Sequence, residues 1–449
     1  MILSLQYQRS PARYLASKGI TSTKPGRRFA GMVAGNISPL RLVNLPAPDL
    51  PGEGWTRVVP MLSGICGSDL GLLTGQSSPY LSPVTSMPFV PGHEVVGETL
   101  DEVPGVPAGS RVVLDPVLSC EPRGTKLCRW CTAGQHSRCD HITTGRIAAG
   151  LQTGFCADTG GGWSRRFVAH HSQLHVIPDE LTNERAVLVE PLACAVHSVR
   201  RVQVPATSTV AVIGAGTVGL MTLLALKELA PDVPVHVVAK HKHQQDRALA
   251  LGAAAVHQPD RATRAIRRTT TARMHVPEFG SEFLLGGVDI VFECTGGATG
   301  LDTALRLARA GGTVVVSGMP SGSVDLTPLW FRELTLVGAY ASGQADAETR
   351  VGDDDAQPDA ESRSRDGGRG VVGRKKASEE RASLGRDRRP EIDGSPTDFH
   401  IAMSLAASAP LDDWVEPPYP LRRWREALAH AIDAGKLGSV KIAFAPGKD

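Results

Sequence analysis

The chain has 449 residues, of which 41 % are hydrophobic, and this is enough for two domains with cores of their own. Its 48 basic and 46 acidic residues nearly cancel, so charge gives no support for a nucleic-acid or membrane-surface partner. The sequence has no apolar run of membrane-spanning length, and its start lacks the features of a secretory signal. We therefore expect a cytoplasmic protein whose thiols stay reduced.

Residues 30–190 are typical of short strands, because Gly and Pro interrupt the apolar segments at short intervals. They predict that the first domain, residues 1–200, is rich in strands and loops. The pattern changes near residue 210, where "TVAVIGAGTVGLMTLLALKELA" predicts a strand, a glycine turn and a helix, and later segments continue this alternation. Residues 201–342 are therefore expected to form an α/β domain, with a doubly wound parallel sheet and helices on both faces.

A charged insertion is expected at residues 343–396. From residue 344 it contains 13 acidic and 11 basic residues and no aromatic residue. Such a segment buries too little apolar surface to offset its ordering entropy, so we predict disorder; a charged helix around "KKASEERASLGRDRR" is the alternative. Residues 397–449, with the helical pattern "LRRWREALAHAIDAG" and the strand "SVKIAFAP", complete the fold.

The stretch "GICGSDL" contains a single thiol, Cys66, which as a lone cysteine would be read as a buried packing residue. However, "PGHEVVGE" supplies His93 and Glu94 downstream, and "LVEPLACAVHSV" supplies Glu190 just before the α/β domain. One thiolate, one imidazole and carboxylates suit zinc, and a catalytic zinc keeps one coordination position open. The four residues are therefore candidate ligands of a catalytic zinc.

A second group of cysteines occurs in "CEPRGTKLCRWCTAGQHSRC". Cys120, Cys128, Cys131 and Cys139 supply four thiolates within a short stretch, and a C-x2-C pair with flanking cysteines in a reduced compartment indicates structural zinc. Four thiolates leave no open position, so this second zinc would only stabilise its lobe. The alternative is four unrelated cysteines. The three remaining cysteines are expected to be packing residues.

The glycine turn carries the pattern G-x-G-x-x-G at Gly214, Gly216 and Gly219. It follows an apolar strand and opens a helix, which is the context of a dinucleotide-binding site. The glycines permit the tight turn, the approach of a pyrophosphate and the packing of helix on strand, and the first helical residues, Thr217 and Val218, would face the phosphates. A glycine-rich turn without a ligand is the alternative.

The second strand of this domain, "VHVVA", ends without the carboxylate that normally binds the adenosine ribose of NAD. Lys240 stands near that position, and His241 and His243 follow it. Basic groups there would pair with a 2′-phosphate, and the absence of an acid removes a repulsion. The pattern therefore predicts NADP rather than NAD, with Lys240 as the main contact; solvated surface charges are the alternative.

Together these motifs resemble the zinc-dependent medium-chain dehydrogenase/reductase family of alcohol, polyol and threonine dehydrogenases. The matching stretches are "GICGSDL", "PGHEVVGE", the four-cysteine lobe, "VEPLACAVH", "VIGAGTVGL" and "GSVKIAFAP", in the family's order. The resemblance implies a GroES-like β-rich catalytic domain with the catalytic zinc, a Rossmann cofactor domain, and a chain that returns to the first domain. It also implies two zinc ions per chain and a homodimer or homotetramer.

The resemblance assigns roles to individual residues. Cys66 and His93 match zinc ligands, while Glu94 and Glu190 occupy two acidic positions, of which one binds the metal and the other reaches it directly or through water. Asp69 matches the carboxylate that orients the histidine ligand.

Ser68 matches the hydroxyl that carries the substrate's proton outward. Two features depart from the family. Gly71 stands where many relatives carry a histidine as the next proton carrier, and seven residues rather than two separate Cys120 from Cys128.

The activity implied is the oxidation of an alcohol or polyol to a ketone or aldehyde, or the reverse reduction, by hydride transfer to or from the nicotinamide. The partner is a small-molecule substrate. Two alternatives remain: a zinc-free quinone- or enoyl-type reductase of the same superfamily, and a zinc-stabilised binding protein without catalytic activity.

Overall fold

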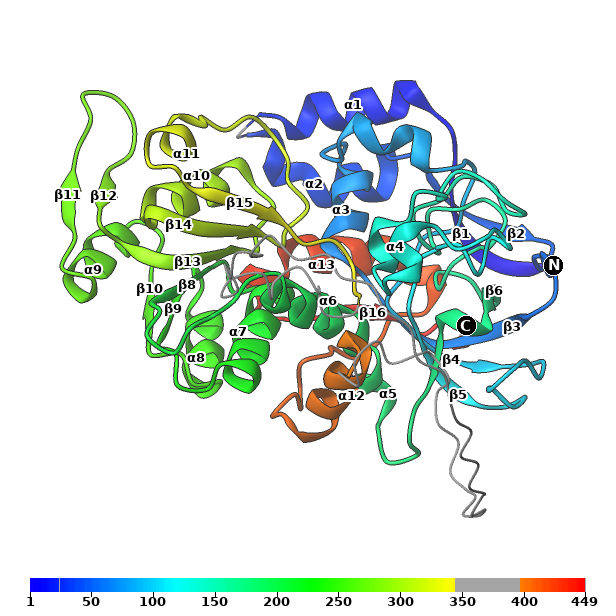
Figure 1. Cartoon of the computed structure of the whole chain (residues 1–449). Helices are drawn as coiled ribbons and strands as arrows, with labels where there is room; N and C mark the ends of the chain where they lie inside the picture. The colour runs from blue at the N-terminus through cyan, green and yellow to red at the C-terminus, as the bar shows by residue number, and fades with distance from the viewer. Residues whose placement is uncertain (24, 344–395, 449) are drawn as a thin grey trace, which may run out of the picture.

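The computed structural model describes residues 1–23, 25–343 and 396–448, which form two domains around a central helix, α13 (Figure 1). Apart from its two end residues, the predicted insertion 343–396 lies outside the described residues. Within the described part of the chain, no helix is both long and apolar enough to cross a membrane.

The first domain is built on a six-stranded antiparallel sheet. Its strand order is β16-β3-β4-β5-β7, and β6 pairs with β3. The strands are β3 (Trp55–Gly64), β4 (Val95–Thr99), β5 (Arg111–Leu114), β6 (Phe167–His170), β7 (Leu174–Val176) and β16 (Ala443–Phe444). The C-terminal strand pairs with the end of β3, where Ala443 lies opposite Gly64, so residues from both ends of the sequence meet beside Cys66.

The second domain confirms the predicted parallel sheet. Its six strands have the order β10-β9-β8-β13-β14-β15, and every neighbouring pair is parallel. They are β8 (Val210–Ile213), β9 (Val235–Val238), β10 (Ala255–His257), β13 (Val288–Glu293), β14 (Ala308–Val316) and β15 (Thr335–Gly338). The strand order reverses between β8 and β13, which is where such sheets bind ligands at the carboxyl ends of their strands.

Helices cover both faces of this sheet, as the alternation of residues in β8 requires. Val210 and Val212 belong to the core that includes α6 (Val189–Arg200) and α7 (Thr217–Leu229). Ala211 and Ile213 belong to the opposite core, which includes α9 (Ala262–Thr269) and α10 (Ala298–Leu307). The helix that follows β9 in the chain is α8 (Lys242–Ala250).

Helices near the N-terminus are a feature that the sequence patterns did not predict. Strands β1 (Ile2–Tyr7) and β2 (Leu40–Leu45) pair antiparallel, and α1 (Pro11–Thr21), a 3₁₀ turn, α2 (Ala30–Met32) and a π turn (Val33–Ile37) lie between them. Figure 1 shows these helices above α3 (Gly67–Leu73) and α13 (Trp424–Leu437). Packing stabilises these short, Gly-containing helices, since Arg425 donates to the carbonyl of Gly35 at 3.0 Å.

The chain leaves the second domain and re-enters the fold at one point. The amide of Gly343 donates to the buried carboxylate of Asp398 at 2.8 Å, and that carboxylate also contacts His197 at 3.0 Å and Arg200 at 2.9 Å on α6. Gly343 and Asp398, which lie on either side of residues 344–396, are therefore fixed next to each other. The other elements are α4 (Arg129–Thr132), α5 (Asn183–Ala186), β11 (Arg273–His275), β12 (Phe283–Leu285), α11 (Thr327–Phe331) and α12 (Asp398–Ser408).

Candidate functional site

Three of the four predicted catalytic-zinc ligands lie together. Cys66 ends the loop after β3 and begins α3, while His93 and Glu94 immediately precede β4. One donor atom from each of these residues lies within 4.8 Å of the others. Because β3 and β4 are antiparallel neighbours, their adjacent ends bring the thiol and the imidazole to the same edge of the sheet.

Asp69 lies where an orienting carboxylate is expected. One of its oxygens accepts from the amide of Cys66 at 3.0 Å, which closes the first turn of α3. The other oxygen lies 3.7 Å from Nδ1 of His93, and both of these buried atoms lack a hydrogen bond partner within the described residues. The ring's Nε2 remains to face Cys66 and Glu94, so the donor set and its unsatisfied atoms fit a zinc ion.

The electrostatics of this cluster reflect its burial. Burial raises the pKa of Asp69 to about 6, against the lowering effect of His93. Burial by itself lowers the pKa of His93, but Asp69 and Cys66 raise it well above its ordinary value. The pKa values of Asp69 and His93 therefore depend on each other's charge.

Glu94 is held by a residue that the motif analysis missed. Both of its carboxylate oxygens accept from Nζ of Lys441, at 2.6 and 2.5 Å, and Lys441 is only 3 % exposed. Burial lowers the pKa of Lys441, but Glu94 and Cys66 raise it above its ordinary value, so the amine stays charged. Its signal in the sequence is the lysine of "GSVKIAFAP", a stretch that matches the family but to which the resemblance assigns no residue role.

Glu190 lies in the first turn of α6 and is buried, but it is not part of the close group of donor atoms. Its Oε1 accepts from the thiol of Cys194 at 3.4 Å, so Cys194, expected only to pack, contacts a candidate ligand. Burial raises the pKa of Glu190 to about 7, while the charge of His93 lowers it and that of Glu94 raises it. This geometry fits the more distant of the two acidic positions.

Ser68 is half-buried on the first turn of α3, beside Cys66. The next relay position, Gly71, faces the second domain: a Cβ there would lie 3.0 Å from the methyl carbon of Met319. A larger side chain at residue 71 would therefore displace Met319. Residue 71 therefore supplies no side chain that could carry a proton beyond Ser68.

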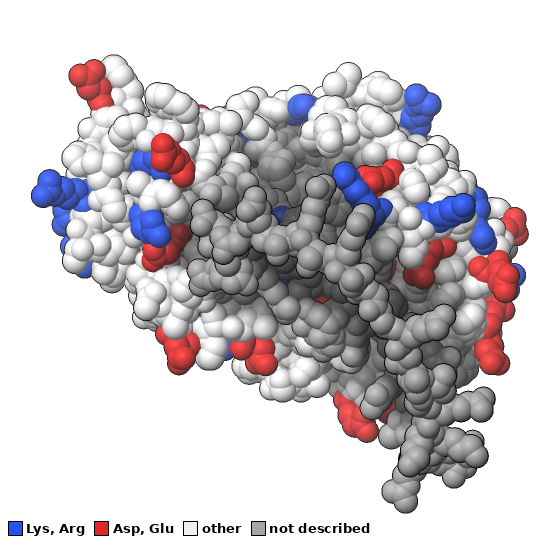
Figure 2. Space-filling view, in the orientation of Figure 1, with Lys and Arg blue, Asp and Glu red and all other residues white. Residues whose placement is uncertain are grey.

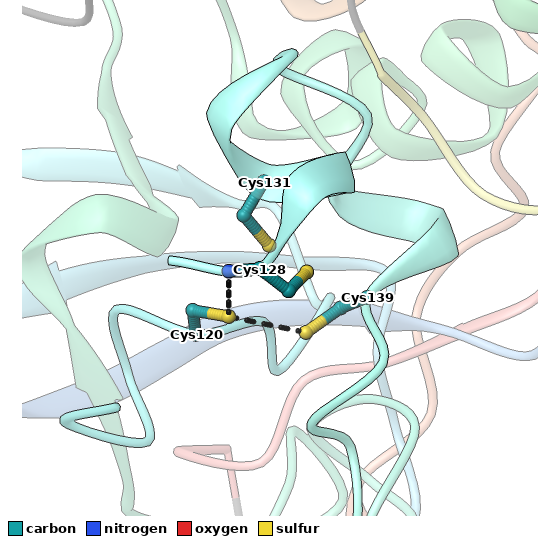
Figure 3. Close-up of side chains that lie close together, drawn as sticks. All are labelled: Cys120, Cys128, Cys131 and Cys139. Carbon is teal, nitrogen blue, oxygen red and sulfur yellow. Dashed lines mark hydrogen bonds between the residues drawn. The ribbon is translucent and has the colours of Figure 1, made fainter. Parts of the chain in front are cut away.

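The four cysteines of the lobe converge as predicted (Figure 3). Their sulfur atoms all lie within 4.8 Å of one another, and the sulfur atoms of Cys120 and Cys139 are 3.5 Å apart. The amide of Cys128 donates to Cys120 and that of His141 donates to Cys139, both at 3.3 Å. Donation from Cys131 lowers the pKa of Cys139 to about 5. Converging thiols and N–H donors fit a tetrahedral metal site.

The long loop between Cys120 and Cys128 contains a fully buried cation, Arg123. Its guanidinium donates to five backbone carbonyls at 2.7 to 3.2 Å, and no described carboxylate forms an ion pair with it. Burial lowers the pKa of Arg123, while the nearby thiols of Cys156, Cys139 and Cys120 raise it. The five accepting carbonyls are those of Leu118, Thr144, Ile147, Ala148 and Gly150.

The glycine turn has the geometry that a dinucleotide requires. Gly214 has a φ of +95°, and a Cβ at Gly219 would lie 1.9 Å from the carbonyl oxygen of Gly214. Gly216 has open space around its Cβ direction and precedes α7. Thr217 donates to the carbonyl of Val440 at 2.8 Å, which joins this helix end to the C-terminal segment. The turn fits a bound pyrophosphate.

The basic residues after β9 are partly engaged. Lys240 is exposed, whereas His243 contacts the carbonyl of Gly435 on α13 at 2.9 Å. Burial lowers the pKa of His241, and so do the charges of Lys240, His243 and Lys436. Lys436 therefore adds to the positive charge near the predicted phosphate contact. On the face shown in Figure 2, acidic and basic side chains are interspersed, as the balanced composition suggests.

Comparisons with known proteins agree with these features. Two family models match, the alcohol dehydrogenase GroES-like domain over residues 52–179 and the zinc-binding dehydrogenase over residues 217–352. Sorbitol dehydrogenase from Arabidopsis thaliana is 30 % identical over 338 residues, which are 72 % of this chain and 83 % of the relative. L-idonate 5-dehydrogenase from Vitis vinifera is 30 % identical over 62 % of this chain and 70 % of its own length.

Solved structures share the fold. The 2R,3R-butanediol dehydrogenase from Bacillus subtilis has a TM-score of 0.62 at 20 % identity, covering 99 % of this chain and 100 % of its own. Galactitol-1-phosphate dehydrogenase from Escherichia coli has a TM-score of 0.61 at 16 % identity, covering 91 % and 97 %.

Proposed function

Because the chain belongs to the zinc-dependent medium-chain dehydrogenase/reductase family, we propose that it interconverts a small alcohol or polyol and its ketone or aldehyde, using zinc and a nicotinamide cofactor. The observation that carries this proposal is the cluster of Cys66, His93 and Glu94, with the unsatisfied pair of His93 and Asp69 behind it. Residues 1–200 and 397–449 form the catalytic domain of this proposal, and residues 201–342 the cofactor domain.

The bound groups supply a Lewis acid for the substrate oxygen and an acceptor or donor of hydride. The chain's own residues do the rest. Asp69 fixes the ring of His93 so that Nε2 faces the site, and Lys441 holds Glu94 by both oxygens. Ser68 takes the proton of the substrate hydroxyl and passes it to solvent, since Gly71 offers no further carrier.

The four-cysteine lobe holds a second, structural zinc through Cys120, Cys128, Cys131 and Cys139. The cofactor is NADP, with its 2′-phosphate at Lys240; Lys436 adds positive charge there, and His241, whose lowered pKa favours the neutral ring, assists by hydrogen bonding. His243 belongs to the same basic cluster beside the 2′-phosphate, and its ring is also hydrogen-bonded to the carbonyl of Gly435 on α13.

The protein forms a homodimer or homotetramer through the outer edge of the parallel sheet. Strand β15 ends the sheet, and Leu336 on it is exposed. Trp330 and Phe331 on α11 are 79 % and 61 % exposed beside it. An exposed edge strand with large apolar neighbours favours pairing with another chain. Light scattering of Leu336→Lys protein should show a smaller species than the wild type.

The test is a panel of alcohols and polyols, scored by nicotinamide absorbance with NAD and with NADP, on protein whose zinc content is measured. Zinc-dependent turnover of at least one alcohol is expected. Reduction of an enone or quinone without zinc would favour the zinc-free reductase. Zinc binding without turnover of any substrate in either direction would favour a binding protein.

A further inference from the structure

A hydrogen bond joins the two domains beside the candidate zinc site. The hydroxyl of Tyr340, two residues after β15, donates to Oε1 of Gln152 at 3.1 Å. Tyr340 belongs to the cofactor-side domain and Gln152 to the first domain, so the bond crosses between them. The family motifs include neither residue.

Gln152 lies in a segment that reaches the metal cluster. In this segment the ring of Phe155 lies 5.9 Å from that of His93. The amide of Leu151 donates to the carbonyl of Val84 at 3.0 Å, which attaches the segment to the loop after α3. Gln152 is thus three residues in the sequence from Phe155, which contacts the imidazole, and follows Leu151, which contacts this loop.

Tyr340 is influenced electrostatically by Cys194 and Glu190 on α6. Burial raises the pKa of its hydroxyl well above the ordinary value, and the charges of Cys194, Glu190 and Asp115 raise it further. The hydroxyl therefore keeps its proton and can donate a hydrogen bond. Nevertheless, 43 % of the residue is exposed, so a small molecule can reach the side chain.

The pair presents hydrogen-bonding groups that are still free. Gln152 uses its Oε1, whereas its amide nitrogen has no partner within the described part of the chain and is not among the fully enclosed unsatisfied atoms. The Tyr340 oxygen donates its only proton and keeps its lone pairs. A donor and an acceptor side by side match a hydroxyl group, which both donates and accepts.

We propose that Tyr340 and Gln152 bind a second hydroxyl of the substrate, next to the hydroxyl that is oxidised, and so select diols and polyols over monohydric alcohols. This inference rests on the proposed dehydrogenase activity. A site built to bind a hydroxyl rejects the analogue that lacks it, because its own polar groups would then be left unpaired.

The test compares 2,3-butanediol with 2-butanol, which share a carbon skeleton and differ by one hydroxyl. Zinc-loaded wild type should show a kcat/KM for the diol at least about 10-fold higher. Tyr340→Phe and Gln152→Leu should each lower this ratio about 10-fold, mainly by raising KM for the diol. Tyr419→Phe is the matched control, because it removes a tyrosine hydroxyl bonded to His430 in the C-terminal segment and should leave the ratio unchanged.

Equal losses for both alcohols in Tyr340→Phe, or a wild type that does not distinguish them, would overturn the inference but leave the dehydrogenase assignment intact. Turnover of neither alcohol nor any other alcohol of the panel by the wild type would overturn the proposed function, and the inference with it. The thermal transitions of the variants identify any loss that comes from misfolding.

Discussion

Lys441 and Glu94 form a buried ion pair between residues 347 positions apart in the sequence, directly beside the candidate zinc ligands. The lysine comes from the segment that leads into β16, and the glutamate from the segment that leads into β4. The pair therefore holds the C-terminal segment to the site. No other described cation lies at ion-pair distance from the Glu94 carboxylate.

Removing this lysine should destabilise the protein strongly. Lys441→Met leaves the Glu94 carboxylate buried without its partner, and breaking a buried pair in this way costs about 3–5 kcal/mol. Urea unfolding of zinc-loaded protein measures the effect. Lys436→Met is the control, because its pair with Asp433 at 2.5 Å is largely exposed and should contribute little. Equal stability of the two variants would mean that leaving Glu94 without Lys441 does not destabilise the protein.

The two metal sites should respond differently to loss of one thiol. Cys66→Ala should abolish turnover and remove one of two zinc ions while the fold is kept. Cys131→Ala should lower the thermal transition or the solubility, because a closed four-thiolate site contributes folding energy. Elemental analysis and thermal unfolding of both proteins check this. If the two variants behaved alike, the division into catalytic and structural sites would be wrong.

Lys240→Asp should shift cofactor preference from NADP toward NAD. A hydrogen bond to a charged group contributes about 1.5–3 kcal/mol, so kcat/KM with NADP should fall by roughly 10- to 100-fold. The new carboxylate would also supply the ribose contact of NAD. Lys242→Asp is a useful comparison, because Lys242 pairs with Asp246 on the exposed side of α8. A wild type that prefers NAD would contradict the assignment.

Stability should fall as the pH drops below about 6.5. His236 on β9 contacts His257 on β10 at 3.0 Å, and burial lowers the pKa of both, with the charge of His236 lowering that of His257 further. In this range the unfolded chain binds protons that the folded chain does not, so acid favours unfolding. His257→Gln removes one titrating group and keeps a donor for His236. Urea midpoints between pH 7 and pH 5 should then decline less than in the wild type; His400→Gln, at an exposed position, should not change the slope.

Residues 344–396 should be dispensable for turnover. Gly343 and Asp398 are hydrogen-bonded to each other, so a short linker from Gly343 to Thr397 spans the gap without moving α6 or α12. Shortening a loop changes its closure entropy by only about 0.6 kcal/mol per doubling of length. A folded deletion variant that lost turnover would show that the segment acts in catalysis or in binding a partner.

Local patterns predicted those parts of the fold and site that depend on neighbouring residues. The glycine turn, the four cysteines and the Cys66–His93–Glu94 group each occur in short stretches whose chemistry is recognisable. The Lys441–Glu94 and Tyr340–Gln152 contacts join segments far apart in the sequence, so no local pattern reports them. The N-terminal helices were missed because their Gly- and Ser-containing residues have weak helix propensity and depend on packing against α13.

The guanidinium of Arg123 joins the two ends of the four-cysteine lobe. It donates to the carbonyl of Leu118, before the first of the four cysteines, and to those of Thr144, Ile147, Ala148 and Gly150, after the last. The chain on either side of the lobe is therefore held together by hydrogen bonds that do not depend on a bound ion.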